Sequence, residues 1–308
     1  MKIVLLDAIT FGNSDLSCFD ALGEVESFAS TQPSLTQARI QGADVIVTNK
    51  VVITKEHMQK TPSLKLICIA ATGMNNVDLE AAKELGIVVK NVAGYSTNSV
   101  VQHTFSMLFY LIGHGRYYDE VTKSGVYSKS GVFTDVSHPF FEIKGKKWGI
   151  IGLGAIGRSV ATLARAFGVD VWYYSTSGVN RDEEFQRTTL ESLLRESDII
   201  TIHAPLNEKT ANLLDYEALS MCKEGAVILN LGRGGIIDED AVAKLVDERD
   251  VRFGLDVFAK EPLSQESPLL QVKNSDRLYL TPHIAWTSVE ARAKLIASVC
   301  QNIKEAPL

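Results

Sequence analysis

Three side chains in the second half of the chain, Arg233, Glu261 and His283, have the chemistry needed to reduce a 2-oxo acid. An arginine is always charged, and its planar fork suits a carboxylate and a carbonyl oxygen. A histidine donates a proton to that oxygen as a hydride arrives at the neighbouring carbon. A glutamate paired with the imidazole favours the charged ring and fixes its orientation. These residue types predict an acid–base site that works beside a hydride donor.

A glycine-rich segment, Gly152-Leu153-Gly154-Ala155-Ile156-Gly157, predicts where such a donor would bind. It follows a predicted strand and opens a helical pattern, which is the context in which G-x-G-x-x-G binds a dinucleotide. We expect Gly152 to make the tight turn, Gly154 to let the backbone approach the pyrophosphate, and Gly157 to let the helix pack on the strand. The alternative is that these glycines serve only a tight turn.

The end of the next predicted strand departs from the usual dinucleotide pattern. Ser175, eighteen residues past Gly157, stands where an acidic residue usually holds the adenosine ribose hydroxyls. A carboxylate would repel a 2′-phosphate, whereas a serine hydroxyl accepts one, and Thr176, Ser177 and Arg181 add further donors. The expected cofactor is therefore NAD(H) or NADP(H), and the sequence leaves the preference open.

Short apolar runs bounded by turn residues alternate with helical patterns along the chain. Continuous apolar runs are typical of strands buried on both faces, and they predict parallel α/β architecture. The predicted strands are 3–6, 45–48, 66–70, 88–91, 149–152, 171–174, 199–203, 227–231, 253–257 and 278–281; the predicted helices are 79–85, 159–167, 190–195, 216–221 and 239–249. Because the catalytic candidates follow strand ends, we expect them to converge on the ligand crevice of a doubly wound sheet.

The length of 308 residues is sufficient for two cores of about 100–200 residues each. Residues 99–122 form a helical pattern without proline, which we interpret as one long helix that bridges two domains. The predicted fold class is α/β, with two Rossmann-like doubly wound parallel-sheet domains joined by this helix. We expect residues 1–97 plus 285–308 to form a flavodoxin-like substrate (catalytic) domain, and residues 98–284 a dinucleotide-binding Rossmann domain.

Composition excludes several classes of function. The formal net charge is −6 without a long run of one sign, so neither nucleic acid nor an anionic membrane is an expected partner. Four cysteines lie far apart without a Cys-x-x-Cys pair, which predicts free thiols in a reducing cytoplasm. We expect a cytoplasmic protein with no signal peptide, no membrane span and no metal site, since the histidines form no ligand cluster.

Five segments together resemble the D-isomer-specific 2-hydroxyacid dehydrogenase family over nearly the whole chain. They are residues 152–157, His203-Ala204-Pro205-Leu206 with Thr210, residues 230–235, Asp256-Val257-Phe258 with Glu261-Pro262, and Pro282-His283-Ile284-Ala285-Trp286. The resemblance implies that Arg233 orients the substrate, that Glu261 is the partner of the base, and that His283 is the acid and base.

The resemblance also implies cofactor contacts and an assembly. Asp256 would meet the nicotinamide amide, and further cofactor contacts would come from the glycine motif and neighbouring loops. These residues are Gly152, Gly154, Ala155, Ile156, Gly157, Ser175, Thr176, His203, Ala204, Pro205, Thr210, Leu231 and Gly232. The family further implies a homodimer, with residues 124–141 near the subunit contact.

The first half of the chain carries a looser match at Asn49-Lys50 and at a turn containing Thr72, Gly73 and Met74. In the family, such a loop offers backbone N–H groups to the substrate carboxylate, and Gly73 allows the close approach that this needs. The alternative is an ordinary turn before the following helix.

Trp286, just after His283, resembles the glycerate dehydrogenase and hydroxypyruvate reductase branch of the family. A bulky aromatic near the base would restrict the pocket to short substrates such as hydroxypyruvate and glyoxylate; alternatively, Trp286 packs at a domain or subunit boundary. The expected function is the interconversion of small 2-oxo acids and D-2-hydroxy acids. The alternatives are a D-lactate-type dehydrogenase of the same family, a nucleotide-sensing corepressor-like binding protein, and a sugar or S-adenosyl-type Rossmann enzyme.

Overall fold

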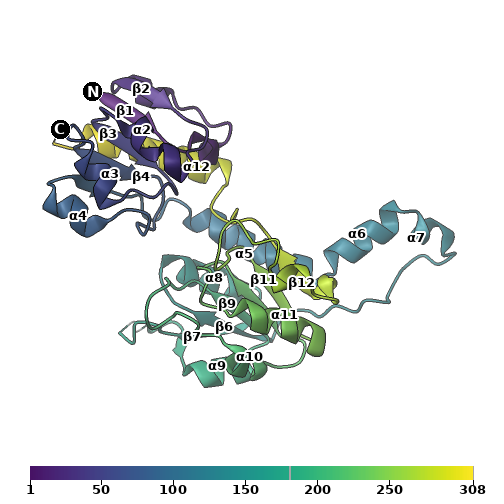
Figure 1. Ribbon diagram of the computed structural model, residues 1–308. Helices are drawn as coiled ribbons and strands as arrows, with labels where there is room; N and C mark the ends of the chain where they lie inside the picture. The colour runs from purple at the N-terminus through teal and green to yellow at the C-terminus, as the bar shows by residue number, and fades with distance from the viewer. Residues whose placement is uncertain (180–181, 308) are drawn as a thin grey trace. The chain divides into compact units, whose positions relative to one another are not determined.

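A computed structural model describes residues 1–179 and 182–307, which form two compact units (Figure 1). The first unit comprises Met1–Ser96 and Thr287–Leu308, and the second comprises Thr97–Trp286. Each contains one sheet of parallel strands. The predicted α/β class with two Rossmann-like parallel sheets is therefore confirmed.

The first unit has a five-stranded sheet in the order β2-β1-β3-β4-β5. Its strands are β1 (Lys2–Leu5), β2 (Glu24–Ser27), β3 (Val45–Thr48), β4 (Leu66–Ile69) and β5 (Val88–Lys90). Its helices are α1 (Ser17–Asp20), α2 (Thr36–Ile40), α3 (Lys55–Gln59), α4 (Leu79–Glu84) and α12 (Val289–Lys304), with 3-10 turns η1 (Ala8–Phe11) and η2 (Pro33–Leu35). This strand order is that of the flavodoxin-like doubly wound folds.

The second unit has a seven-stranded sheet in the order β12-β11-β10-β9-β6-β7-β8. Its strands are β6 (Lys147–Ile151), β7 (Asp170–Tyr174), β8 (Gln186–Arg187), β9 (Ile199–Ile202), β10 (Val227–Asn230), β11 (Arg252–Leu255) and β12 (Leu278–Leu280). Its helices include α8 (Ala155–Ala166), α9 (Leu190–Glu196), α10 (Tyr216–Ser220) and α11 (Glu239–Glu248), with η3 (Pro268–Leu270) and η4 (Ser275–Arg277). The order reverses between β6 and β9, which is where a doubly wound sheet opens a ligand crevice.

Two hydrophobic clusters within the second unit explain why its strands are continuously apolar. One cluster joins α5 (Thr97–Ile112) and α8 to one set of strand side chains, and the other joins α9, α10 and α11 to the alternate set. Trp148 is fully buried in the first cluster, and its indole N–H donates to Thr201 Oγ1 at 3.0 Å. Both faces of the central strands are thus covered, as the sequence pattern predicts.

The predicted helix over residues 99–122 is interrupted, so the expectation of a single helix over this range is wrong. Helix α5 ends at Ile112, and α6 (Gly115–Lys123) and α7 (Val126–Lys129) follow as separate helices. His114, between two glycines, adopts a left-handed conformation with φ of 49°. A non-glycine residue in this conformation cannot continue a right-handed helix, so the chain changes direction there.

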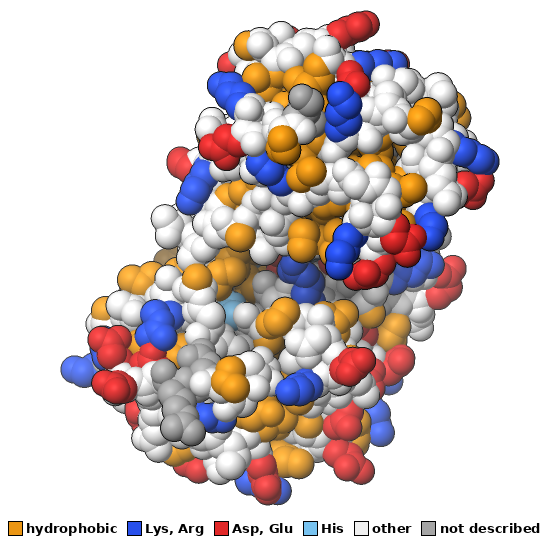
Figure 2. Space-filling view, turned by 90° about the vertical axis from the view of Figure 1, so that its left-hand side faces the viewer, with side chains coloured by type: hydrophobic (Ala, Val, Ile, Leu, Met, Phe, Trp, Pro, Cys, Tyr) orange, Lys and Arg blue, Asp and Glu red, His pale blue; other side chains and the backbone are white. Residues whose placement is uncertain are grey.

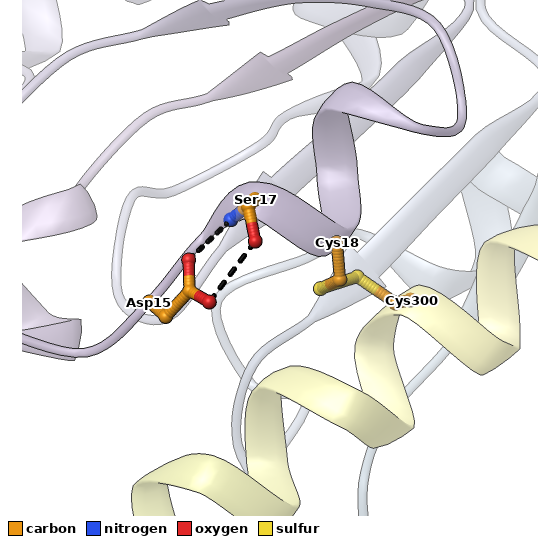
Figure 3. The surroundings of a disulfide bond; sticks show 4 residues. All are labelled: Asp15, Ser17, Cys18 and Cys300. Atoms are coloured by element: carbon orange, nitrogen blue, oxygen red, sulfur yellow. Dashed lines mark hydrogen bonds between the residues drawn. A yellow bond between two sulfur atoms is a disulfide. The ribbon is translucent and has the colours of Figure 1, made fainter.

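A disulfide in the first unit corrects the expectation that all cysteines are free. Cys18 in α1 is bonded to Cys300 in α12, across 282 residues of sequence (Figure 3). Helices α1 and α12 are in contact, which brings the two Cα atoms within 6.4 Å. Cys68 and Cys222 are free and buried, as predicted.

The surface carries charges of both signs. On the face drawn in Figure 2, acidic and basic side chains are interspersed, and no large area of that face has a single sign. Among the described residues, none of the helices is both long enough and apolar enough to cross a bilayer.

Candidate active site

The proposed acid–base pair is formed in the second unit. His283 Nδ1 lies 2.7 Å from Glu261 Oε2, and the other carboxylate oxygen of Glu261 accepts a hydrogen bond from the Phe258 N–H at 3.1 Å. Both side chains are partly exposed, at 23% for His283 and 29% for Glu261. Because the carboxylate engages Nδ1, Nε2 is the nitrogen that remains for proton exchange with a substrate.

Arg233 lies in the loop after β10, and hydrogen bonds and close backbone packing fix the shape of this loop. The Asn230 side chain accepts a hydrogen bond from the Gly232 N–H at 3.0 Å and donates one to the Arg233 carbonyl at 2.8 Å. A Cβ atom on Gly234 would lie 1.8 Å from the Phe258 carbonyl oxygen, so only glycine fits against that backbone. This packing brings the Arg233 loop against the segment that leads to Glu261.

The glycine motif connects β6 to α8 as a tight cradle. Gly152 has a φ of 93°, and a Cβ there would lie 2.9 Å from the Ala204 backbone nitrogen. A Cβ on Gly157 would lie 2.2 Å from the Gly152 carbonyl oxygen, whereas a Cβ on Gly154 would meet no atom within 4 Å. Gly152 and Gly157 are thus required by packing, and Gly154 keeps space open at the N-terminus of α8, where an anion is stabilised.

A cavity of about 550 Å³ opens beside this cradle at the carboxyl ends of β6, β7 and β9. The residues that line it are Gly152, Leu153, Gly154, Ser175, Thr176, Ser177, His203, Pro205, Asn207, Glu208 and Lys209. The cavity therefore joins the glycine turn to the hydroxyl-rich end of β7. The volume falls within the range that protein cavities for small molecules and cofactors occupy.

His203 is an unusual member of this lining. Both of its ring nitrogens are buried without a hydrogen-bond partner among the described residues, and burial lowers the pKa of the imidazole to about 3. The ring is therefore neutral near pH 7 and offers one donor and one acceptor. Buried polar groups normally have partners, so a bound molecule is the natural partner for these nitrogens. The cradle, the open space at Gly154 and the unpaired imidazole together fit a dinucleotide.

The end of β7 presents hydroxyl groups to the cavity. Ser175 is buried, and its Oγ lies 3.4 Å from Ser177 Oγ. The nearby carboxylate of Asp182 is engaged by the Arg158 guanidinium. Arg181, which we expected to contribute here, lies outside the described residues.

Most of the other predicted cofactor residues of the second unit lie in two adjoining loops, and two lie at the start of α8. A Cβ on Gly232 would lie 2.8 Å from the Ala204 carbonyl oxygen, so the loop after β10 packs on the loop after β9. The Thr210 hydroxyl donates to the Pro205 carbonyl at 2.6 Å and therefore fixes the shape of the loop after β9. Ala155 and Ile156 begin α8, and Ile156 packs against the hydrophobic core.

The predicted substrate residues of the first unit follow β3 and β4. The N–H groups of Asn49 and Lys50 donate to the buried Asp7 carboxylate at 2.9 and 2.7 Å. The Thr72 hydroxyl donates to the Val92 carbonyl at 3.1 Å. The substrate-binding roles of Asn49, Lys50, Thr72, Gly73 and Met74 stay predictions, as does that of half-buried Trp286 in the second unit.

Sequence reasoning missed several residues near these groups. Leu153, Asn207, Glu208 and Lys209 line the cavity, although they were not among the predicted cofactor contacts. Their position beside the glycine turn and just after Pro205 was the available signal. Across residues 1–179 and 182–307, no three His, Cys, Asp or Glu side chains are placed to hold a metal ion.

The chain is similar to known proteins over nearly its whole length. Residues 105–285 match the family model described as D-isomer specific 2-hydroxyacid dehydrogenase, NAD binding domain. Hydroxypyruvate reductase of Blautia hydrogenotrophica is 34% identical, with 99% of this chain and 96% of that protein covered. Glycerate dehydrogenase of Methylorubrum extorquens is 33% identical, with 98% and 95% covered. The solved structure of an acyclic imino acid reductase with NADPH and D-Arg has a TM-score of 0.86 at 29% identity, with 99% and 96% covered.

Two glycine substitutions separate cofactor binding from folding. Gly154→Ala should keep the melting temperature nearly unchanged, because its Cβ would enter open space, but should weaken NADH and NADPH binding about 10-fold or more by filling the cradle. Gly157→Ala should instead lower the unfolding free energy by about 1–3 kcal/mol, because its Cβ would collide with the Gly152 carbonyl. Calorimetry of folding and of cofactor binding measures both; equal cofactor affinity in the wild type and Gly154→Ala would contradict the assignment.

Proposed function

The chain belongs to the D-isomer specific 2-hydroxyacid dehydrogenase family, and we propose that it reduces short 2-oxo acids such as hydroxypyruvate and glyoxylate. The products are D-2-hydroxy acids, and the reverse oxidation uses the same residues. The observation that carries the proposal is the 2.7 Å contact between His283 and Glu261, in the unit that also holds the glycine cradle. The names of the relatives support a substrate with a short side chain.

Each catalytic residue has a defined task in the proposed reaction. A nicotinamide cofactor in the cavity would supply a hydride for carbon 2. Arg233 binds the carboxylate and the carbonyl oxygen, and thereby stabilises the negative charge that develops on that oxygen. His283 Nε2 gives its proton to the same oxygen, and Glu261 stabilises the imidazolium before this transfer. In the oxidation direction, His283 accepts the hydroxyl proton.

Removal of the imidazole tests the acid–base assignment. His283→Ala should lower kcat for hydroxypyruvate by about 100-fold or more, because it removes the proposed proton donor. The dissociation constant for the cofactor should change by no more than about twofold, because the cavity is intact.

The assay uses hydroxypyruvate, glyoxylate, pyruvate, phenylpyruvate and 2-oxoisocaproate, each with NADH and NADPH. The control is His57→Gln, a substitution in α3 of the first unit. Near-normal turnover by His283→Ala would exclude this residue as the proton donor. No reduction of any 2-oxo acid by the wild type would reject the proposed function.

We further propose that NADP(H) is the preferred cofactor. The position after β7 is Ser175 in place of an acid, and the hydroxyls of Thr176 and Ser177 line the same cavity. Lys209 also lines it and provides a positive charge for a 2′-phosphate, close to the acidic Glu208. Hydroxyl donors with a cation suit a phosphate better than they suit the ribose diol, which usually binds a carboxylate.

Ser175→Asp tests the cofactor preference. The new carboxylate would repel a 2′-phosphate and accept hydrogen bonds from ribose hydroxyls, so kcat/KM for NADPH should fall about 10-fold or more while that for NADH rises. Lys209→Gln should lower kcat/KM for NADPH alone. Steady-state kinetics with both cofactors decide the point, and a wild type that strongly prefers NADH would overturn the proposal.

We propose that the chain forms a homodimer through the segment that contains α6, α7 and the loop after them. Helices α6 and α7 bury no residue and stand clear of the seven-stranded sheet (Figure 1). In the following loop Phe133 is 89% exposed and Val136 79% exposed, and Phe140 is also exposed. Several large apolar side chains exposed along one segment are typical of a surface that another chain covers.

Charged substitutions on this segment test the assembly. Phe133→Glu combined with Val136→Glu should convert a dimer into a monomer of 33.7 kDa, because a carboxylate is costly to bury at an interface. Sedimentation equilibrium measures the mass, and Ile9→Glu, at an exposed apolar site of the first unit, is the control. A wild type that sediments as a monomer would contradict the proposal.

A further inference from the structure

The backbone at His283 requires support from its surroundings. His283 has a φ of 54°, a left-handed conformation that is uncommon for a residue with a Cβ atom. Such a conformation is strained for a residue with a side chain, and it persists where neighbouring contacts enforce it. The His283 N–H donates to the Thr281 carbonyl at 2.9 Å, and this bond holds the part of the turn that precedes the histidine. The contacts that follow the histidine therefore matter.

The Asp256 carboxylate provides these contacts. The Ile284 N–H donates to Oδ1 at 2.8 Å, and the Ala285 N–H donates to Oδ2 at 2.9 Å. The next carbonyl is also held, because the Ser99 hydroxyl of α5 donates to the Ala285 oxygen at 2.6 Å. The two residues after His283 are thus fixed by a carboxylate on one side and a helix on the other.

A polar chain in turn holds Asp256. The carboxylate is buried at the end of β11, and the Thr281 hydroxyl donates to Oδ1 at 2.6 Å. His103 Nε2 of α5 lies 3.2 Å from Thr281 Oγ1. Because Thr281 has one hydroxyl proton and gives it to Asp256, His103 Nε2 must be the donor to Thr281. The direction of donation runs from His103 to Thr281 to Asp256, whose oxygens then accept the two backbone N–H groups.

We propose that Thr281 and His103 are positioning residues for proton transfer: through Asp256 they hold the turn that presents the His283 imidazole. This inference rests on the proposed function. Oδ1 of Asp256 accepts from Thr281 and Ile284, and Oδ2 accepts from Ala285. The carboxylate therefore acts on the turn, in addition to the nicotinamide contact that the family implies. A misplacement of about 1 Å in a reacting group costs up to about 100-fold in rate, so loosening this turn should be visible in kcat.

Thr281→Val and Thr281→Ser in the full-length enzyme test the proposal. Valine keeps the shape and removes the hydroxyl, whereas serine keeps the hydroxyl. Thr281→Val should speed amide hydrogen exchange at Ile284 and Ala285 about 10-fold and lower kcat about 10-fold. KM and the cofactor dissociation constant should stay within about twofold, and Thr281→Ser should restore both exchange and kcat.

Two further variants complete the design. Thr104→Val removes another buried hydroxyl, which bonds the Val100 carbonyl within α5, and should change neither exchange at 284–285 nor kcat. His103→Leu removes the group that donates to Thr281 and should produce the same effects as Thr281→Val, but more weakly. If Thr281→Val does not fold, His103→Leu tests the proposal in its place.

The outcomes separate this proposal from the proposed function. Amide exchange is measured without cofactor or substrate, so it reports on the turn even if the wild type reduces no 2-oxo acid. Unchanged exchange in Thr281→Val, or faster exchange without a loss of kcat, would overturn the positioning role. An equal loss of cofactor affinity and kcat would do so too, because it would assign the network to cofactor binding alone.

Discussion

The register of three neighbouring parallel strands is the constraint on which the proposed catalytic arrangement depends. Asn230 of β10 pairs with Leu255 of β11, which pairs in turn with Leu280 of β12. The loops that carry Arg233, Glu261 and His283 therefore leave the sheet at one level, although they are separated in sequence. A shift of one residue between two strands would turn every side chain on one of them to the opposite face and separate these groups.

Backbone packing then holds the loops of the site in place relative to one another. Gly234 lies against the Phe258 carbonyl and Gly232 against the Ala204 carbonyl, so adjoining loops touch through main chain rather than through adaptable side chains. The Asn230 side chain fixes the turn before Arg233 from both ends. Contacts of this kind leave little freedom, which suits groups that must meet a substrate within fractions of an ångström.

The sequence allows the local chemistry to be predicted better than the long-range contacts. Continuous apolar strands, the glycine motif and the Arg, Glu and His residues after strand ends follow from patterns of a few residues. Strand β2 was missed because Val25 is its only apolar residue, as is typical of an exposed edge strand. The break at His114 depends on a single left-handed residue, and the bond between Cys18 and Cys300 joins elements 282 residues apart.

Residues with an unfavourable backbone conformation or a buried polar group are found among the proposed site residues. His283 adopts a left-handed backbone conformation, and Asp256 buries a carboxylate. His203 buries two ring nitrogens that have no hydrogen-bond partner in the described parts of the chain. A buried charge is tolerated only when donors surround it, and Asp256 has a hydroxyl and two N–H groups as donors. These features have a common consequence: each keeps a polar group in a fixed place. Local sequence patterns therefore predict candidate side chains such as His283, whereas the hydrogen bonds behind them depend on contacts between distant parts of the chain.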